Sequence, residues 1–241
     1  MSTAPAVGKN GRVDDDARRA ALLEAQEKAE ELFDAIVEQD VLRAGITERA
    51  LSVEIRDLAK TLLGVEQHWH KRVVRSGPNS MLAYGANPPD RLIGPDDVVY
   101  LDLGPVFASW EADFGRTYVL GDNPDPRKME LIESLPIAWD DGKQIFDETP
   151  DITGAQLYAF MREWAETNGW TFGQQTAGHI IGDFPHVLAP GEPDHSRIAP
   201  ANDRPLRGVD TEGRALHWIL EVFLVDHERG FGGFHEELLT L

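Results

Sequence analysis

Two acidic residues interrupt an apolar stretch near the middle of the chain. Asp102 and Asp113 lie within residues 98–121, whose two ends have the β-branched and aromatic composition of strands. If these ends pair antiparallel around residues 107–108, Asp102 lies opposite Asp113 on the same face. Like charges opposed across a sheet are destabilising, so this pair is either exposed to water or neutralised by a strongly positive group. A divalent cation that prefers hard oxygen ligands would neutralise it.

A second acidic pair lies near the end of the chain. Residues 217–241 are expected to form a hairpin that turns near residues 228–229. This register places Glu221, in the apolar run "WILEVFLV", opposite Glu236. A single opposed pair is explained by two solvated acids on a polar sheet face. Two such pairs on separate hairpins favour a shared cation site.

The segment "AGHIIGDFPH" adds two histidines to the candidate site. His179 lies between Gly178 and Gly182, a pattern that indicates a backbone packed close to another group, and His186 follows seven residues later. An isolated histidine is more often structural than a ligand. Four carboxylates with one imidazole, however, would form a dinuclear metal site that is close to neutral overall.

The elements that must position these residues alternate between helix pairs and hairpins. Apolar residues recur at helical spacing in four segments, and residues 70–85 are expected to form a strand that ends in a turn. We therefore expect an α+β fold of two similar halves, with helices packed on antiparallel strands. Residues 1–13 are expected to be a disordered tail, and residues 14–241 a single domain. The expected helices are 15–39, 47–64, 125–148 and 153–169.

A long loop is expected before the second hairpin. Residues 184–214 contain five prolines and show little periodicity, and loops of this length in compact domains are usually functional. This loop is expected to border the site. Its candidate substrate contacts, each of which could equally be a solvated loop residue, are His195, Arg197, Arg204 and Arg207.

The composition excludes several classes of protein. The chain of 241 residues carries 42 acidic and 23 basic residues, a formal net charge of −19, so neither nucleic acid nor a membrane is expected as a partner. No apolar run approaches the length of a transmembrane helix, and no secretory signal is visible. The absence of cysteine excludes thiolate chemistry and fits a cytoplasmic location.

These motifs together resemble those of the pita-bread metallohydrolases, the family of methionine aminopeptidase, aminopeptidase P, prolidase and creatinase. "YLDLG" and "EADFGRT" are similar to the family's two aspartate motifs, "GHIIGDFPH" to its histidine motif, and "ILE" and "FHEELL" to its two glutamate motifs. The resemblance implies a pita-bread fold and a centre of two divalent ions, manganese first, with cobalt, iron or zinc as alternatives. The implied ligands are Asp102, Asp113, His179, Glu221 and Glu236.

The resemblance also implies roles in cleaving an amide bond. Asp113 and Glu236 would bridge the two ions, which lower the pKa of a shared water. Asp102 and Glu221 would each bind one ion, and His179 would complete one coordination sphere. Glu221 would also pass a proton to the leaving amine.

His186 has two possible roles in this scheme. It would either donate a hydrogen bond to the developing oxyanion or orient another residue of the site. The implied catalytic residues are therefore His179, His186 and Glu221.

The sequence also departs from the family pattern. Ala83-Tyr84 stands where the peptidases usually carry a substrate-contacting histidine, Val222 replaces proline after Glu221, and Val187 replaces glutamate after His186. The helical N-terminal region leads us to expect a short form without the extra domain of longer members. A peptidase that acts ahead of proline is expected first, as a cytoplasmic homodimer with a small peptide or amide substrate. A creatinase-like hydrolase of a small metabolite and a non-catalytic binding module are the alternatives.

Overall fold

Helices and an antiparallel sheet make up the computed structural model, which describes residues 15–189 and 193–241. The expected tail, residues 1–13, lies outside the described residues. No described helix is both long and apolar enough to cross a membrane. The α-helices are α1 (Asp15–Glu38), α2 (Glu48–Leu63), α3 (Pro126–Glu148) and α4 (Gly154–Thr167). The strands are β1 (Val73–Ser76), β2 (Val98–Leu103), β3 (Val106–Phe107), β4 (Trp110–Glu111), β5 (Phe114–Val119), β6 (Thr171–Phe172), β7 (Ile180–Ile181), β8 (His217–Asp226) and β9 (Phe231–Leu238). Short 3₁₀ helices are η1 (Gly77–Met81) and η2 (Pro193–Ser196).

Local capping groups set the helix boundaries that the sequence predicts. The Thr47 hydroxyl accepts a hydrogen bond from the Ala50 N–H at the start of α2, and Gly64 ends this helix in the left-handed conformation. At the start of α4, Thr153 and Gln156 form a reciprocal capping box. These caps satisfy backbone groups that would otherwise lack partners at the helix ends.

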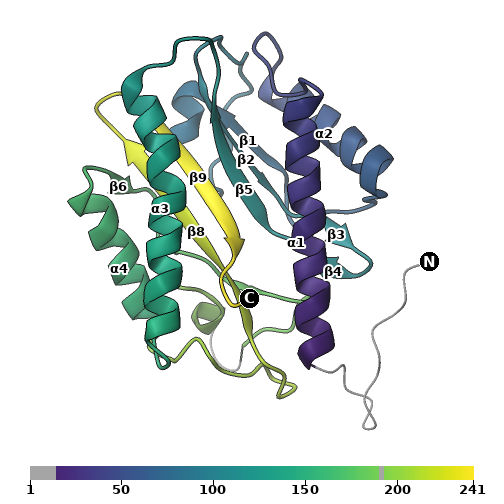
Figure 1. Cartoon of the computed structure of the whole chain (residues 1–241), viewed down its shortest axis with the longest axis vertical. Coiled ribbons are helices and arrows are strands. Elements are labelled where there is room, and N and C mark those ends of the chain that lie inside the picture. Colours follow the sequence, from purple (N-terminus) through teal and green to yellow (C-terminus); the bar gives the residue numbers. More distant parts are fainter. Residues whose placement is uncertain (1–14, 190–192) are drawn as a thin grey trace.

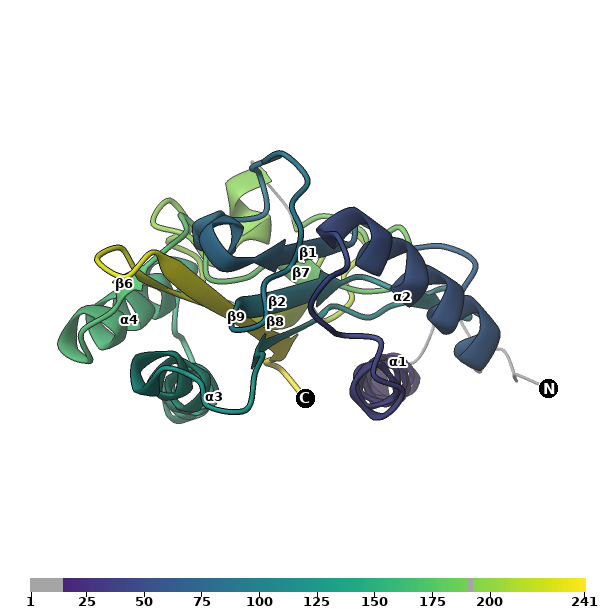
Figure 2. The ribbon, with the colours of Figure 1, turned by 90° about the horizontal axis from the view of Figure 1, so that it is seen from above.

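The main sheet joins two halves of similar construction. Its strand order is β1-β2-β5-β9-β8-β6, with β7 paired to β8 outside this path. The helices α1 and α3 lie on the same face of the sheet, one against each half (Figures 1 and 2). The α+β class and the two-halved arrangement are therefore confirmed.

The central strands are buried on both faces. In β2, Leu101 and Leu103 belong to the core cluster that includes α1 and α2, whereas Tyr100 packs with Phe223 and Phe234 in a separate cluster. Because side chains alternate along a strand, Asp102 points to the same face as Tyr100, away from the helices. The acids therefore lie on the face of the sheet opposite to the helix layer.

The two hairpins differ in how well the sequence predicts their register. Glu221 pairs directly with Glu236, as expected. Asp102, however, pairs with Gly115, so the expected direct opposition of Asp102 and Asp113 is wrong. Asp113 lies two residues before Gly115, diagonal to Asp102 across the two strands.

The first hairpin turns one residue later than expected. Ala108 and Ser109 connect β3 to β4, and both have positive φ, 49° and 80°. A two-residue hairpin turn of this kind favours Asn-Gly or Asp-Gly, because most side chains resist positive φ. Ala-Ser carries no such signal, which explains why the sequence gave the wrong centre for this turn.

Candidate metal centre and active site

The predicted site residues converge on one cavity of about 700 Å³. Its acids come from both halves of the sheet, from β2 and the start of β5 in one half and from β8 and β9 in the other. All six residues that the sequence predicts for the site line this cavity: Asp102, Asp113, His179, His186, Glu221 and Glu236.

Asp113 lies at the centre of the site. Donor atoms of Asp113, His179 and Glu236 all lie within 4.8 Å of one another. His179 Nε2 is 3.2 Å from Asp113 Oδ2 and 3.6 Å from Glu221 Oε1. A second group of donors, equally close, also contains Asp113, together with Asp102 and His70. The two groups therefore share one carboxylate.

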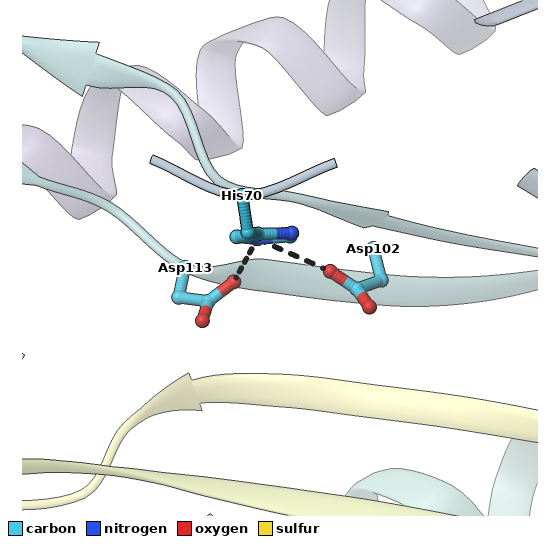
Figure 3. Close-up of side chains that lie close together, drawn as sticks. All are labelled: His70, Asp102 and Asp113. Carbon is cyan, nitrogen blue, oxygen red and sulfur yellow. Dashed lines mark hydrogen bonds and ion pairs between the residues drawn. The ribbon is translucent and has the colours of Figure 1, made fainter. Parts of the chain in front are cut away.

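His70 is a site residue that the sequence analysis missed. Its Nε2 lies 3.0 Å from Asp113 Oδ1 and 3.4 Å from Asp102 Oδ1, and its side chain is only 6% exposed (Figure 3). It reaches the acids from the segment that precedes β1 and lies beside Tyr84, with ring centroids 5.7 Å apart. His70 is far from either aspartate in sequence, so only the fold relates them.

Glu111 is a second residue that the sequence analysis missed. This buried carboxylate lies 2.8 Å from His186 Nδ1 and accepts backbone hydrogen bonds from His186 and Gly182. It thus fixes the orientation of the His186 ring at the cavity wall. Because Glu111 belongs to the short β3–β4 hairpin, the misplaced turn concealed this contact.

The long loop contributes one of its four candidate substrate contacts. Arg197 lines the cavity, whereas His195 and Arg204 are not among the described residues that line it. The Arg207 guanidinium instead stacks on the Phe146 ring of α3 and donates to the Phe146 carbonyl. The expectation that Arg207 contacts substrate is therefore wrong.

Mutual repulsion and burial dominate the electrostatics of the acids. Burial raises the pKa of Asp102 to about 7, against the attraction of His70. Burial and the charges of Asp113 and Asp102 also raise the pKa of Glu236 well above its usual range. The pKa of Glu221 is raised in the same way, chiefly by burial. These acids resist ionisation until a cation is close.

The imidazoles counteract this repulsion at Asp113. Burial acts to raise the pKa of Asp113, but His70 and His179 outweigh it and lower the pKa below its usual range. Burial acts in turn to lower the pKa of His70, but Asp113 and Asp102 outweigh it and raise the pKa to about 9. The pKa of His179 is raised for the same reason.

The donors fit a pair of divalent ions. Glu236 Oε2 is buried and has no hydrogen-bond partner among the described residues. A buried carboxylate oxygen without a partner is costly, and a bound cation would satisfy it. Carboxylate oxygens with imidazole nitrogens suit manganese, iron, cobalt and zinc.

Comparison with known proteins identifies the family. The model of metallopeptidase family M24 matches residues 20–228, and the chain belongs to this family. The fold is therefore the pita-bread fold, and members of the family bind a pair of divalent metal ions.

The similar proteins include peptidases that act at proline. An Xaa-Pro dipeptidase of Pyrococcus horikoshii is 27% identical over 180 residues, which cover 71% of this chain and 50% of that protein. The chain spans about half the length of the curated relatives it matches. Among solved structures, a prolidase of Thermococcus sibiricus has a TM-score of 0.73 at 25% identity, over 95% of this chain and 59% of that one. An X-Pro aminopeptidase of Thermotoga maritima, 23% identical, shows the same fold with a TM-score of 0.74, over 95% of this chain and 62% of that one.

Removal of metal is expected to destabilise the protein most at neutral pH. A carboxyl with a raised pKa takes up a proton on folding, so its effect on stability worsens as pH rises, for Asp102 between 3.8 and about 7. The stabilising charge of His70 is likewise lost between 6.5 and about 9. Metal at a hundredfold excess over its Kd would offset about 2.7 kcal/mol, roughly 5–10 °C in Tm.

Thermal melts with and without chelator, at pH 7 and pH 5, measure this effect. The difference in Tm between the two forms is expected to shrink at pH 5, where the acids are protonated and metal is weakly held. Equal melting temperatures at pH 7 would show that the acids need no metal.

Proposed function

We propose that this protein is a dinuclear metallopeptidase that hydrolyses the peptide bond before proline. The observation that carries this proposal is Asp113, a buried carboxylate shared by two groups of metal-donor atoms. Manganese is the proposed metal, because hard oxygen donors outnumber imidazoles in the site. The relatives named Xaa-Pro dipeptidases support a peptidase over the creatinase-like alternative.

The ligand roles follow from the positions of the acids. Asp113 and Glu236, at the junction of the two halves, would hold both ions, while Asp102 and Glu221 would each hold one. His179 would complete one coordination sphere. When bound, the ions supply Lewis-acid activation of water and of the scissile carbonyl.

Two further contacts prepare side chains for proton transfer and charge stabilisation. Gln174 Nε2 donates to Glu221 Oε2 at 2.8 Å, which leaves the other oxygen of Glu221 to take a proton from the attacking water and pass it to the amine. Glu111 binds His186 Nδ1, so Nε2 remains to donate to the developing oxyanion.

The cavity wall favours a short substrate with a free carboxylate. Arg197 is the one arginine or lysine among the described lining residues, and it lies exposed near the acids. Tyr100, Phe223 and Phe234 supply aromatic surface on which a proline ring would pack. We therefore infer an Xaa-Pro dipeptide as the substrate. The lack of cysteine supports a cytoplasmic location, and the homodimer remains a prediction from the family resemblance.

The function is tested with manganese-reconstituted protein and a panel of Xaa-Pro dipeptides, longer Xaa-Pro peptides and small amidino metabolites. We expect about two ions per chain and fastest turnover of the dipeptides. Asp113→Ala is expected to lose metal and to reduce turnover to background, because the shared ligand is gone. Full metal content and turnover in this variant would contradict the proposal.

Arg197→Ala is expected to reduce kcat/KM for Xaa-Pro dipeptides by roughly ten- to hundredfold, as for a lost charged hydrogen bond of about 1.5–3 kcal/mol. Amidated Xaa-Pro substrates, which lack the carboxylate, are expected to lose little. Arg207→Ala is the matched control, because Arg207 lies in the same loop but packs on α3. Equal losses for both kinds of substrate would contradict carboxylate recognition.

His186→Ala is expected to lower kcat by about 10²–10³-fold with unchanged metal content, the usual effect of removing an oxyanion donor. Glu111→Gln, which removes the charge that orients the ring, is expected to give a smaller loss in kcat. Steady-state kinetics and metal analysis distinguish the two roles of His186. A loss of metal in His186→Ala would instead assign this residue to positioning the metal centre.

A further inference from the structure

The chain brings a second imidazole into the acid cluster. The segment Gln67–His70 lies along the first hairpin, where the Trp69 N–H donates to the Gly104 carbonyl at 2.9 Å and the Val106 N–H donates to the Gln67 carbonyl at 3.1 Å. A Cβ on Gly104 would lie 2.1 Å from His70 Cδ2. The hairpin is therefore shaped to admit this ring, and no larger residue fits at Gly104.

His70 and His179 are held in the same way. His70 Nδ1 lies 2.7 Å from the Lys71 carbonyl oxygen, and His179 Nδ1 lies 2.8 Å from the Ile180 carbonyl oxygen. In both cases Nε2 faces Asp113, at 3.0 Å from Oδ1 for His70 and 3.2 Å from Oδ2 for His179. Each oxygen of Asp113 thus faces one imidazole.

This arrangement is typical of histidines that bind metal. Such a histidine usually donates its other ring N–H to a carbonyl or carboxylate, which fixes the tautomer and leaves the remaining nitrogen as a ligand. With metal–ligand bonds of about 2.1 Å, neighbouring ligand atoms lie about 3 Å apart. The distances from His70 Nε2 to Asp113 and Asp102, 3.0 and 3.4 Å, are close to this spacing.

Trp69 fixes the position of this imidazole. Its indole N–H donates to the Ala112 carbonyl at 3.1 Å, and its ring contacts both His70 and His179, at centroid distances of 4.5 and 5.1 Å. The indole therefore contacts both rings edge to face and restricts both to orientations that face Asp113. The side chain of His70 is also too buried to serve as an ordinary surface group.

We propose that His70 is a sixth metal ligand, so that each ion has one imidazole. His70 would join Asp102 and Asp113 around one ion, and His179 would join Asp113 and Glu236 around the other. This inference rests on the proposed dinuclear centre and adds a ligand to the five that the family resemblance implies. A neutral imidazole leaves the charge balance between four carboxylates and two divalent ions unchanged.

Proton NMR of the cobalt-substituted protein tests the ligand directly. A histidine bound to cobalt through Nε2 shows a hyperfine-shifted, exchangeable signal from its Nδ1–H. We expect two such signals in the wild type. His70→Gln should remove one and His179→Gln the other. A wild type with one such signal would overturn the proposal, whether or not any variant folds.

Titration with cobalt or manganese against a competing chelator gives an independent measurement. His70→Gln is expected to weaken one of the two ions by at least about tenfold, the lower end of what is lost when even an outer partner of a ligand is removed. His68→Gln is the matched control, because His68 lies in the same segment but outside the acid cluster. The control is expected to keep both signals and both affinities.

The outcomes separate this inference from the function on which it rests. If the wild type takes up two ions and His70→Gln keeps both with unchanged affinity and spectrum, the sixth ligand is wrong and the dinuclear centre stands. A loss of turnover alone in that variant would make His70 a substrate contact in place of the missing family histidine. If the wild type binds fewer than two ions, the proposed function itself fails.

Discussion

The repulsion among four carboxylates in one cavity is the constraint on which the rest of the structure depends. Three of them, Asp102, Asp113 and Glu236, are buried, and burial together with neighbouring charge raises the pKa of Asp102 and Glu236. Such a cluster costs several kcal/mol unless positive charge compensates it. The imidazoles of His70 and His179 supply part of that charge, and both act on Asp113. A pair of divalent ions would supply the rest, so that folding and metal binding are coupled.

The sheet meets this cost by holding the acids rigidly. Each half contributes one pair, and the halves join where Gly115 of β5 pairs with Glu236 of β9. A Cβ on Gly115 would lie 2.5 Å from the Phe234 ring, so the close approach of the two strands requires glycine here. On the opposite face, Leu101 and Leu220 belong to the two large clusters that the helices cover. Burial of that apolar face stabilises strands whose other face carries repelling charge.

Local signals in the sequence were sufficient for the helices and for one of the two hairpins. Thr47 and Gly64 mark the ends of α2 because caps act on the nearest backbone groups, and the pairing of Glu221 with Glu236 follows from the turn between β8 and β9. The first hairpin was misplaced because Ala108-Ser109 adopts positive φ without glycine or asparagine. His70 and Glu111 were missed because their contacts depend on pairing between segments far apart in the chain, which no local pattern encodes.

The origin of the donors explains where this chain can depart from its family. The acids lie on or next to paired strands, where a shift of one residue would turn the side chain to the helix face. The imidazoles come instead from connecting segments that are pinned to the sheet at a few points. Ile219 N–H, for example, donates to the His179 carbonyl, and Trp69 N–H donates to that of Gly104. Such segments can exchange a histidine without changing the register of any strand. The acid positions are therefore fixed by the fold, whereas the number and origin of the imidazoles are free to differ.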